Sequence, residues 1–118
     1  MRGREIIVWR YPKRIWQEDP FAMMVLTQVN FEVFGYLHGV NFIQHAKEIA
    51  DRLGVRGWIR ITRYGTAMGQ IQGEKDRVEE MALWLRHTGS PGCRIEFVAY
   101  QNWKVIDGFE YRKFNARV

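Results

Sequence analysis

The stretch from Phe34 to Ile43, "FGYLHGVNFI", separates two different hydrophobic patterns. Before it, Val29, Phe31 and Val33 alternate with other residues, which predicts a strand. After it, apolar residues recur at helical spacing as far as residue 53, and the glycine at residue 54 is typical of a helix end. The stretch therefore predicts a loop that joins a strand to a helix.

Two glycines, Gly35 and Gly39, bracket this loop. A glycine-rich loop at the start of a helix can direct several backbone N–H groups at an anion. A cation would complete the charge match, but Ile43 stands where the loop gives way to the helix. The predicted anion-binding loop consists of Gly35, Tyr36, Leu37, His38, Gly39, Val40, Asn41 and Phe42.

The remaining patterns give the order of the elements. Further strands are predicted at residues 58–63, 66–73, 93–101 and 108–116. A second helix is predicted at residues 78–85, before the breaker Gly89-Ser90-Pro91. The order β-α-β-β-α-β with one further strand predicts an α+β fold, the ferredoxin-like α/β sandwich. We expect an antiparallel sheet with both helices on one face.

The length of 118 residues allows one domain, and its first part differs from the rest. We interpret residues 1–28 as a partly ordered N-terminal extension and residues 29–118 as the domain. The extension carries Trp9 and Trp16, and tryptophans often anchor interfaces. They are expected either to pack on the chain's own domain or to contact a protein partner.

Composition narrows the classes of protein. The single Cys93 excludes an internal disulfide, and no apolar run approaches the roughly 18 residues of a membrane span, so we expect a cytoplasmic protein. His45 and His87 lack the spacing of metal ligands, and neither a metal nor a cofactor is expected. The net charge of +5 favours an anionic partner, or serves only solubility.

Several spaced motifs resemble the acylphosphatase family over residues 29–118. They are "FEVFGYLHGVNF", "GVRGWIRITRYGTAMGQIQG" and "VEEMALWLRHTGSP", in that order, and "FEYRKF" is similar to the family's last strand. The residues that match the family pattern are Val33, Gly35, Gly39, Val40, Phe42, Gly57, Trp58, Gly65, Thr66, Gln72, Gly73, Trp84, Leu85, Gly89, Ser90 and Pro91.

The resemblance implies a metal-free hydrolase of acyl phosphates, which cleaves their carboxyl-phosphate bond. It implies that loop amides hold the phosphate, that an arginine pairs with the phosphate oxygens and that an asparagine holds the attacking water. In this chain the arginine position is Ile43 and the asparagine position is Ile61. An isoleucine can neither donate a charge-assisted hydrogen bond nor orient water.

Two functions follow from this departure. The first is a catalytically impaired or inactive family member that acts as a binding or interaction module. The alternative is an active acylphosphatase in which Arg63 or His38 supplies the cation. Arg60 is less suited, because strand alternation places it on the face opposite Ile61.

The two isoleucines and the order of elements also allow simpler roles and another partner. Ile61 shares a strand face with Ile59 and would then extend the core, and Ile43 would cover the helix start against the extension. RNA-recognition modules share this order of elements, but the strand "TAMGQIQG" lacks the aromatic residues they need, so nucleic acid is not expected. The expected ligand is a small anion, a phosphate or acyl phosphate.

Overall fold

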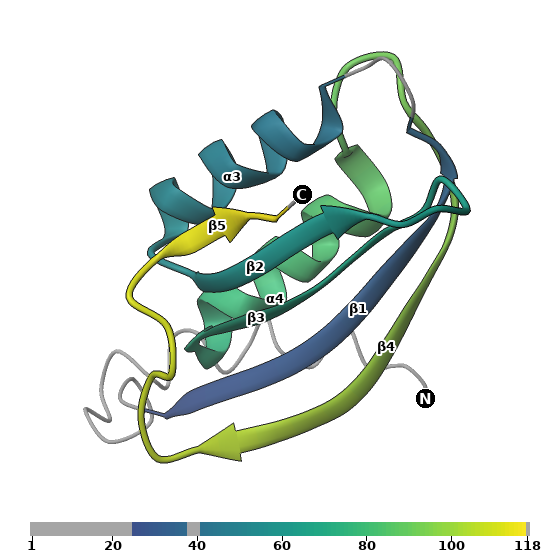
Figure 1. The fold of residues 1–118 in the computed structure, drawn as a ribbon. Coiled ribbons are helices and arrows are strands. Elements are labelled where there is room, and N and C mark those ends of the chain that lie inside the picture. The colour runs from purple at the N-terminus through teal and green to yellow at the C-terminus, as the bar shows by residue number, and fades with distance from the viewer. Residues whose placement is uncertain (1–24, 38–40, 118) are drawn as a thin grey trace.

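The computed structural model describes residues 25–37 and 41–117. These residues form one five-stranded sheet in the order β4-β1-β3-β2-β5, with the helices α3 and α4 against one face (Figure 1). The ferredoxin-like class is confirmed. The elements are β1 (Leu26–Tyr36), α3 (Phe42–Leu53), β2 (Arg56–Ile61), β3 (Ala67–Glu74), α4 (Lys75–Leu83), a π-helical turn η2 (Trp84–Thr88), β4 (Arg94–Ile106) and β5 (Phe114–Ala116).

The direction of the last strand differs from the expectation of an antiparallel sheet. The pairs β1–β3, β1–β4 and β2–β3 are antiparallel, but β5 pairs in parallel with β2. After β4 the chain turns back, and β5 lies at the opposite edge of the sheet beside β2. There β5 runs in the same direction as β2. Moreover, only Phe114–Ala116 of the predicted residues 108–116 form this strand.

The strand before the glycine loop follows the predicted alternation. Val29, Phe31 and Val33 are buried beneath the helices, whereas Asn30 and Glu32 lie half-buried on the other face. The strand begins at residue 26, so residues 26–28, which the sequence assigned to the extension, already pair within the sheet. The rest of that extension, Trp9 and Trp16 included, lies outside the described residues.

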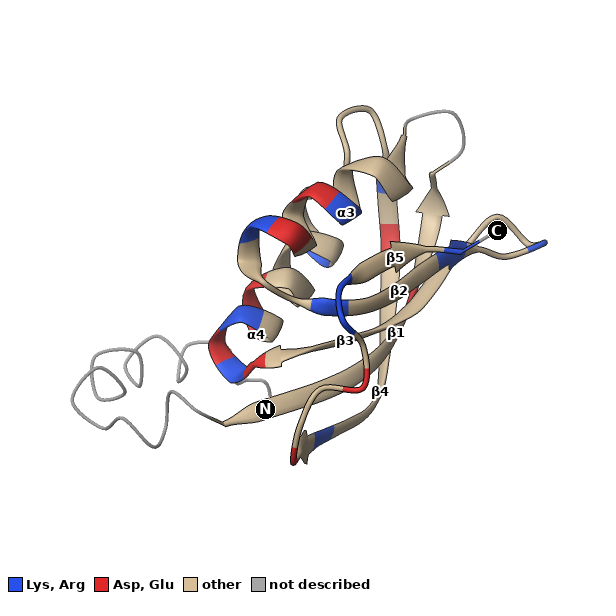
Figure 2. Cartoon of the chain, turned by 60° about the vertical axis from the view of Figure 1, so that its left-hand side comes forward, with Lys and Arg blue, Asp and Glu red and all other residues tan. Residues whose placement is uncertain are grey.

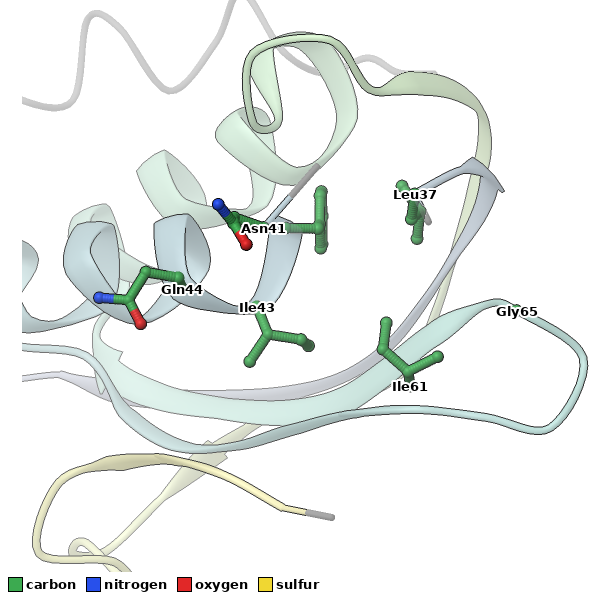
Figure 3. A pocket seen from close by; sticks show the side chains of 7 residues that line it. Leu37, Asn41, Ile43, Gln44, Ile61 and Gly65 are labelled. Carbon is green, nitrogen blue, oxygen red and sulfur yellow. The ribbon is translucent and has the colours of Figure 1, made fainter. Parts of the chain in front are cut away.

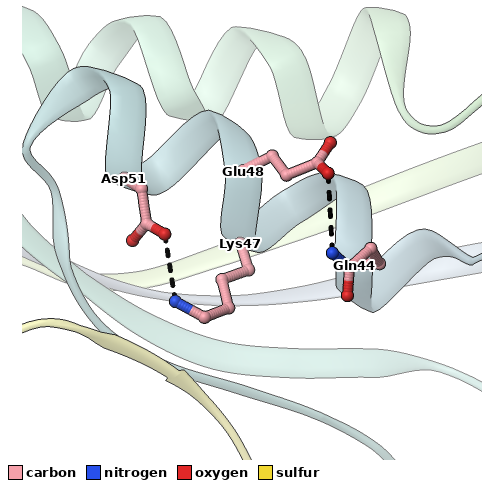
Figure 4. Close-up of polar contacts among 4 residues, drawn as sticks. All are labelled: Gln44, Lys47, Glu48 and Asp51. Atoms are coloured by element: carbon pink, nitrogen blue, oxygen red, sulfur yellow. Dashed lines mark hydrogen bonds and ion pairs between the residues drawn. The ribbon is translucent and has the colours of Figure 1, made fainter.

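The helix after the loop is amphipathic as predicted. Its buried residues are Phe42, Ala46 and Ala50, and Gly54 ends it in the left-handed conformation with φ of 73°. Charged residues cover the outer faces of both helices (Figure 2). On α3 they include the pair Lys47–Asp51, whose Nζ and Oδ2 are 3.0 Å apart, and beside it Gln44 contacts Glu48 (Figure 4). The solvated face is thus held by pairs one turn apart.

The packing of α4 against β4 includes one buried polar contact. The Tyr100 hydroxyl donates to the carbonyl oxygen of Ala82 at 2.6 Å. Burial, opposed in part by the nearby Arg86 guanidinium, raises the pKa of Tyr100 well above its ordinary value. β4 extends to Ile106, beyond the predicted residue 101, and its register shifts near Asn102, which has a φ of 58°.

A buried amide network joins the sheet to the segment before β5. The Gln72 Nε2 donates to Gln28 Oε1 at 2.6 Å and to Glu110 Oε1 at 3.2 Å, and Gln72 Oε1 accepts from the Glu110 backbone N–H at 2.9 Å. Gln72 has no exposed surface. The network therefore satisfies a fully buried amide and fixes the returning segment on the sheet.

Within residues 25–37 and 41–117, no helix is long and apolar enough to cross a membrane.

Candidate functional site

A cavity of about 390 Å³ opens beside the start of α3. It lies where α3 begins and β2 ends, and Figure 3 shows the side chains of Ile43 and Ile61 facing this space from those two elements. The structure thus brings together the two positions that the family pattern assigns to chemistry, although 18 positions separate them in the chain. The described lining residues are Leu37, Asn41, Phe42, Ile43, Gln44, Ile61 and Gly65.

The two isoleucines form a wall of this cavity. Ile59, two residues before Ile61 on the same strand face, is fully buried, but Ile61 is 45% exposed because it is the last residue of β2. The interpretation of Ile61 as an extension of the closed core is therefore wrong. Ile43 is half-buried and packs against the core cluster. Whether Ile43 also contacts the N-terminal extension falls outside the described residues.

The ends of the glycine loop lie beside the same cavity. A Cβ at Gly35 would overlap the carbonyl oxygen of Arg94, so this position requires a residue without a side chain. Leu37 is buried, and Asn41 adopts a left-handed conformation with φ of 53° before its carbonyl accepts from the His45 N–H. The middle of the loop, His38 to Val40, lies outside the described residues.

None of the described residues that line the cavity carries an ionisable side chain. Arg63 is exposed in the turn between β2 and β3 and is not among these lining residues. Arg60 contacts the Met68 sulfur across the adjacent strand, and it follows the buried inward-facing Ile59, so it lies on the sheet face away from the cavity. The roles suggested for Arg63 and His38 therefore stay predictions.

The turn that carries one wall of the cavity is held by a chain of hydrogen bonds that the sequence analysis missed. The Thr62 and Thr66 hydroxyls are 2.6 Å apart, and the Thr66 hydroxyl donates to Glu32 Oε2 at 2.7 Å. Thr62 Oγ1 also accepts from the backbone N–H of Tyr64. Threonines that flank a glycine turn are the signal that would have indicated this cluster. The network fixes the turn next to Ile61.

Gln44 is the other lining residue that the sequence analysis did not single out. It follows Ile43 directly on α3 and lines the edge of the cavity, but its amide is directed toward Glu48 on the solvated face of the helix. With Asn41 it supplies the polar side chains of the described lining, and both are neutral. The site can therefore desolvate an apolar group, but its described side chains offer no charge to a phosphate.

Trp58 and Trp84, the tryptophans of the family pattern, both contact neighbouring side chains of the fold. The Trp84 ring lies 5.6 Å from that of Phe42 beneath the start of α3, and the Arg117 guanidinium lies over Trp58. Trp84 therefore packs against the core, and Trp58 lies half-buried beneath Arg117. Among the described residues there is no group of three histidine, cysteine or acidic side chains that could hold a metal ion.

The part of the chain that forms this sheet and cavity is similar to known proteins of one family. The family model for acylphosphatase matches residues 29–116. Acylphosphatase-2 of Xenopus tropicalis is 41% identical over 78% of this chain and 89% of that protein, and acylphosphatase-2 of Homo sapiens is 41% identical over 78% and 93%. The structure of an acylphosphatase from Coxiella burnetii matches with a TM-score of 0.68 and 27% identity, over 79% of this chain and 94% of that one.

Proposed function

Because this chain belongs to the acylphosphatase family, we propose that it is a binding module with little of the hydrolytic activity for which the family is named. One observation carries the proposal. Ile43 and Ile61 line one cavity, at the positions where the family resemblance places the phosphate-binding arginine and the water-holding asparagine. The cavity is present, but these two groups of the chemistry are replaced by aliphatic side chains.

The size of the expected loss of hydrolytic activity follows from how proteins bind phosphate. A charge-assisted hydrogen bond contributes about 1.5–3 kcal/mol, and an arginine that stabilises a phosphoryl-transfer transition state can contribute roughly 10³–10⁵ in rate. Loss of the water-holding amide adds an orientation cost. Backbone N–H groups of the loop can still attract an anion, but they carry no full charge.

The direct test is hydrolysis of benzoyl phosphate by the full-length chain, with human acylphosphatase-2 as the positive control. We expect kcat/KM to be lower by at least about 10³-fold than that of the control. The double variant Ile43→Arg with Ile61→Asn should raise hydrolysis about tenfold or more over the unmodified chain. The matched variant Ile43→Leu with Ile61→Leu keeps the aliphatic wall and should gain nothing.

Turnover by the unmodified chain at a rate close to that of the control would contradict the proposal. A folded Arg/Asn double variant without any gain would show that the two isoleucines are not the cause of the low rate. Circular dichroism of each variant separates loss of fold from loss of chemistry.

The second candidate function is an active acylphosphatase with a different cation. The 41% identity to acylphosphatase-2 over most of the chain favours it. Arg63, in the turn next to the cavity, or His38, in the loop, would then pair with the phosphate. Hydrolysis that the Arg63→Ala or His38→Ala variant abolishes, and that Arg60→Ala leaves unchanged, would support this candidate, because Arg60 lies on the other face of the sheet.

A further inference from the structure

Exposed apolar side chains gather at the end of the sheet that carries the cavity. Of the six large hydrophobic side chains that are exposed among the described residues, four lie there. Tyr36 ends β1, Ile61 ends β2, Tyr64 stands in the following turn and Phe97 lies near the start of β4. Tyr64 is 81% exposed and Tyr36 72%. Clustered exposed aromatic side chains are typical of interaction surfaces.

This end of the sheet carries an aromatic platform on its open face and a recess on its helix face. The rings of Phe34 and Phe97, from adjacent strands, lie 5.6 Å apart and form a small aromatic platform. The recess is the cavity of about 390 Å³, whose described walls include Leu37, Ile43 and Ile61. Interfaces commonly insert one apolar anchor residue into such a recess, and neighbouring contacts exclude water from it.

The charge at this end is predominantly positive. Arg63 lies in the turn, and Arg94 pairs with Tyr36 at the start of β4. Neither of these two arginines forms an ion pair within the part of the chain that the structure describes, and Figure 2 shows basic segments at the end of β2. Such a surface attracts an acidic partner and favours its encounter rate.

The nearby carboxylates do not cancel this charge. Glu32 accepts the hydrogen bond of Thr66 at 2.7 Å and is half-buried on the open face of the sheet. Glu96 is the exposed acidic residue between Arg94 and Phe97. Arg63 and Arg94 therefore stand against one exposed carboxylate at this end of the sheet.

We propose that this end of the molecule binds an acidic polypeptide segment, with one aliphatic or aromatic side chain of that segment inserted into the cavity between Ile43 and Ile61. The inference rests on the proposed binding function and names the class of partner. The arginines contact the acidic residues on either side of the inserted side chain. A single-stranded nucleic acid fits less well, because the ring in the described lining, Phe42, is buried and offers a base little surface for stacking.

The test is selection of a random 12-residue peptide library on the full-length chain, followed by affinity measurement of the selected peptides. We expect selected sequences to combine aspartate or glutamate with one Leu, Ile, Met or Phe. Ile61→Ser should weaken their binding about tenfold or more. Val105→Ser, at a more exposed apolar site at the far end of the sheet, should leave the affinity unchanged.

A second set of variants tests the contribution of charge to binding. Combining Arg63→Ala with Arg94→Ala should lower the association rate several-fold and reduce the salt dependence, whereas Arg77→Ala on α4 should change neither. Failure to select acidic peptides, or binding that Ile61→Ser does not alter, would overturn the docking proposal. Tighter binding of a poly(U) oligonucleotide than of any selected peptide would overturn it in favour of nucleic acid.

These outcomes are separable from failure of the proposed function. If the docking proposal alone is wrong, the chain will neither hydrolyse benzoyl phosphate nor select such peptides. If the proposed function itself is wrong, benzoyl phosphate will be hydrolysed at a rate close to that of the control enzyme.

Discussion

Replacing Gln72 with leucine tests how strongly the buried amide network holds the C-terminal segment on the sheet. Gln72 is fully buried, and its amide donates to Gln28 Oε1 at 2.6 Å and accepts from the Glu110 N–H at 2.9 Å. Leucine has a similar shape, so the change removes the hydrogen bonds and leaves little cavity. The variant therefore isolates the polar contribution.

The magnitude follows from the groups that lose their partner. The Gln28 oxygen, in a side chain that is only 6% exposed, would become a buried unsatisfied acceptor, which costs about 1–3 kcal/mol. Glu110 is exposed and can turn to water, so its loss is that of an ordinary hydrogen bond, about 1 kcal/mol. The expected total is about 2–4 kcal/mol, out of a typical domain stability of about 5–15 kcal/mol.

Urea unfolding followed by tryptophan fluorescence measures this loss. The urea midpoint should fall. In thermal unfolding, Tm should drop by about 10–25 °C, since about 1 kcal/mol corresponds to roughly 4–8 °C for a domain of this size. The double variant Gln28→Leu with Gln72→Leu removes both partners and should lose less than the sum of the two single variants. A loss below about 0.5 kcal/mol for Gln72→Leu, or strict additivity in the double variant, would refute the reasoning.

Two further predictions concern the scaffold. Burial raises the pKa of Tyr100, so the folded state keeps a proton that the unfolded chain releases above its ordinary pKa of about 10. The free energy of unfolding should therefore fall as the pH rises past about 10, and Tyr100→Phe should remove that part of the decline; equal slopes for both proteins in denaturant titrations would contradict this. At Gly57 (φ 141°) a Cβ would overlap the Gln70 carbonyl oxygen, so Gly57→Ala should cost about 3 kcal/mol or more. Gly65→Ala meets no neighbour and should cost only about 1 kcal/mol, and similar thermal midpoints for the two variants would refute the steric argument.

The local elements were predictable because each depends on neighbours in the sequence. The alternation at Val29, Phe31 and Val33 and the helical spacing that ends at Gly54 both match the observed burial. The missed features depend on residues far away in the chain. The parallel pairing of β5 is set by the strand that it meets, and the added length of β4 is set by β1 along its whole edge.

The candidate site was predictable only in part, because it too depends on contacts between residues that are distant in the chain. The family resemblance identified positions 43 and 61, and the structure places both at one cavity. The sequence could not show how much of Ile61 is exposed, because strand alternation gives the face of a residue but not where the covering helix stops. The cluster of Thr62, Thr66 and Glu32 also joins two strands, and a local pattern does not contain the pairing between them.

By itself, the sequence determined the family, the ferredoxin-like order of elements and the absence of the arginine and asparagine from their family positions, since each is a property of residue type and spacing. Only the tertiary structure decided that the two isoleucines face a common cavity, and that exposed aromatic and arginine side chains surround its end of the sheet. Those features arise where segments distant in the chain come to lie side by side, and their positions are set by strand pairing and helix packing together.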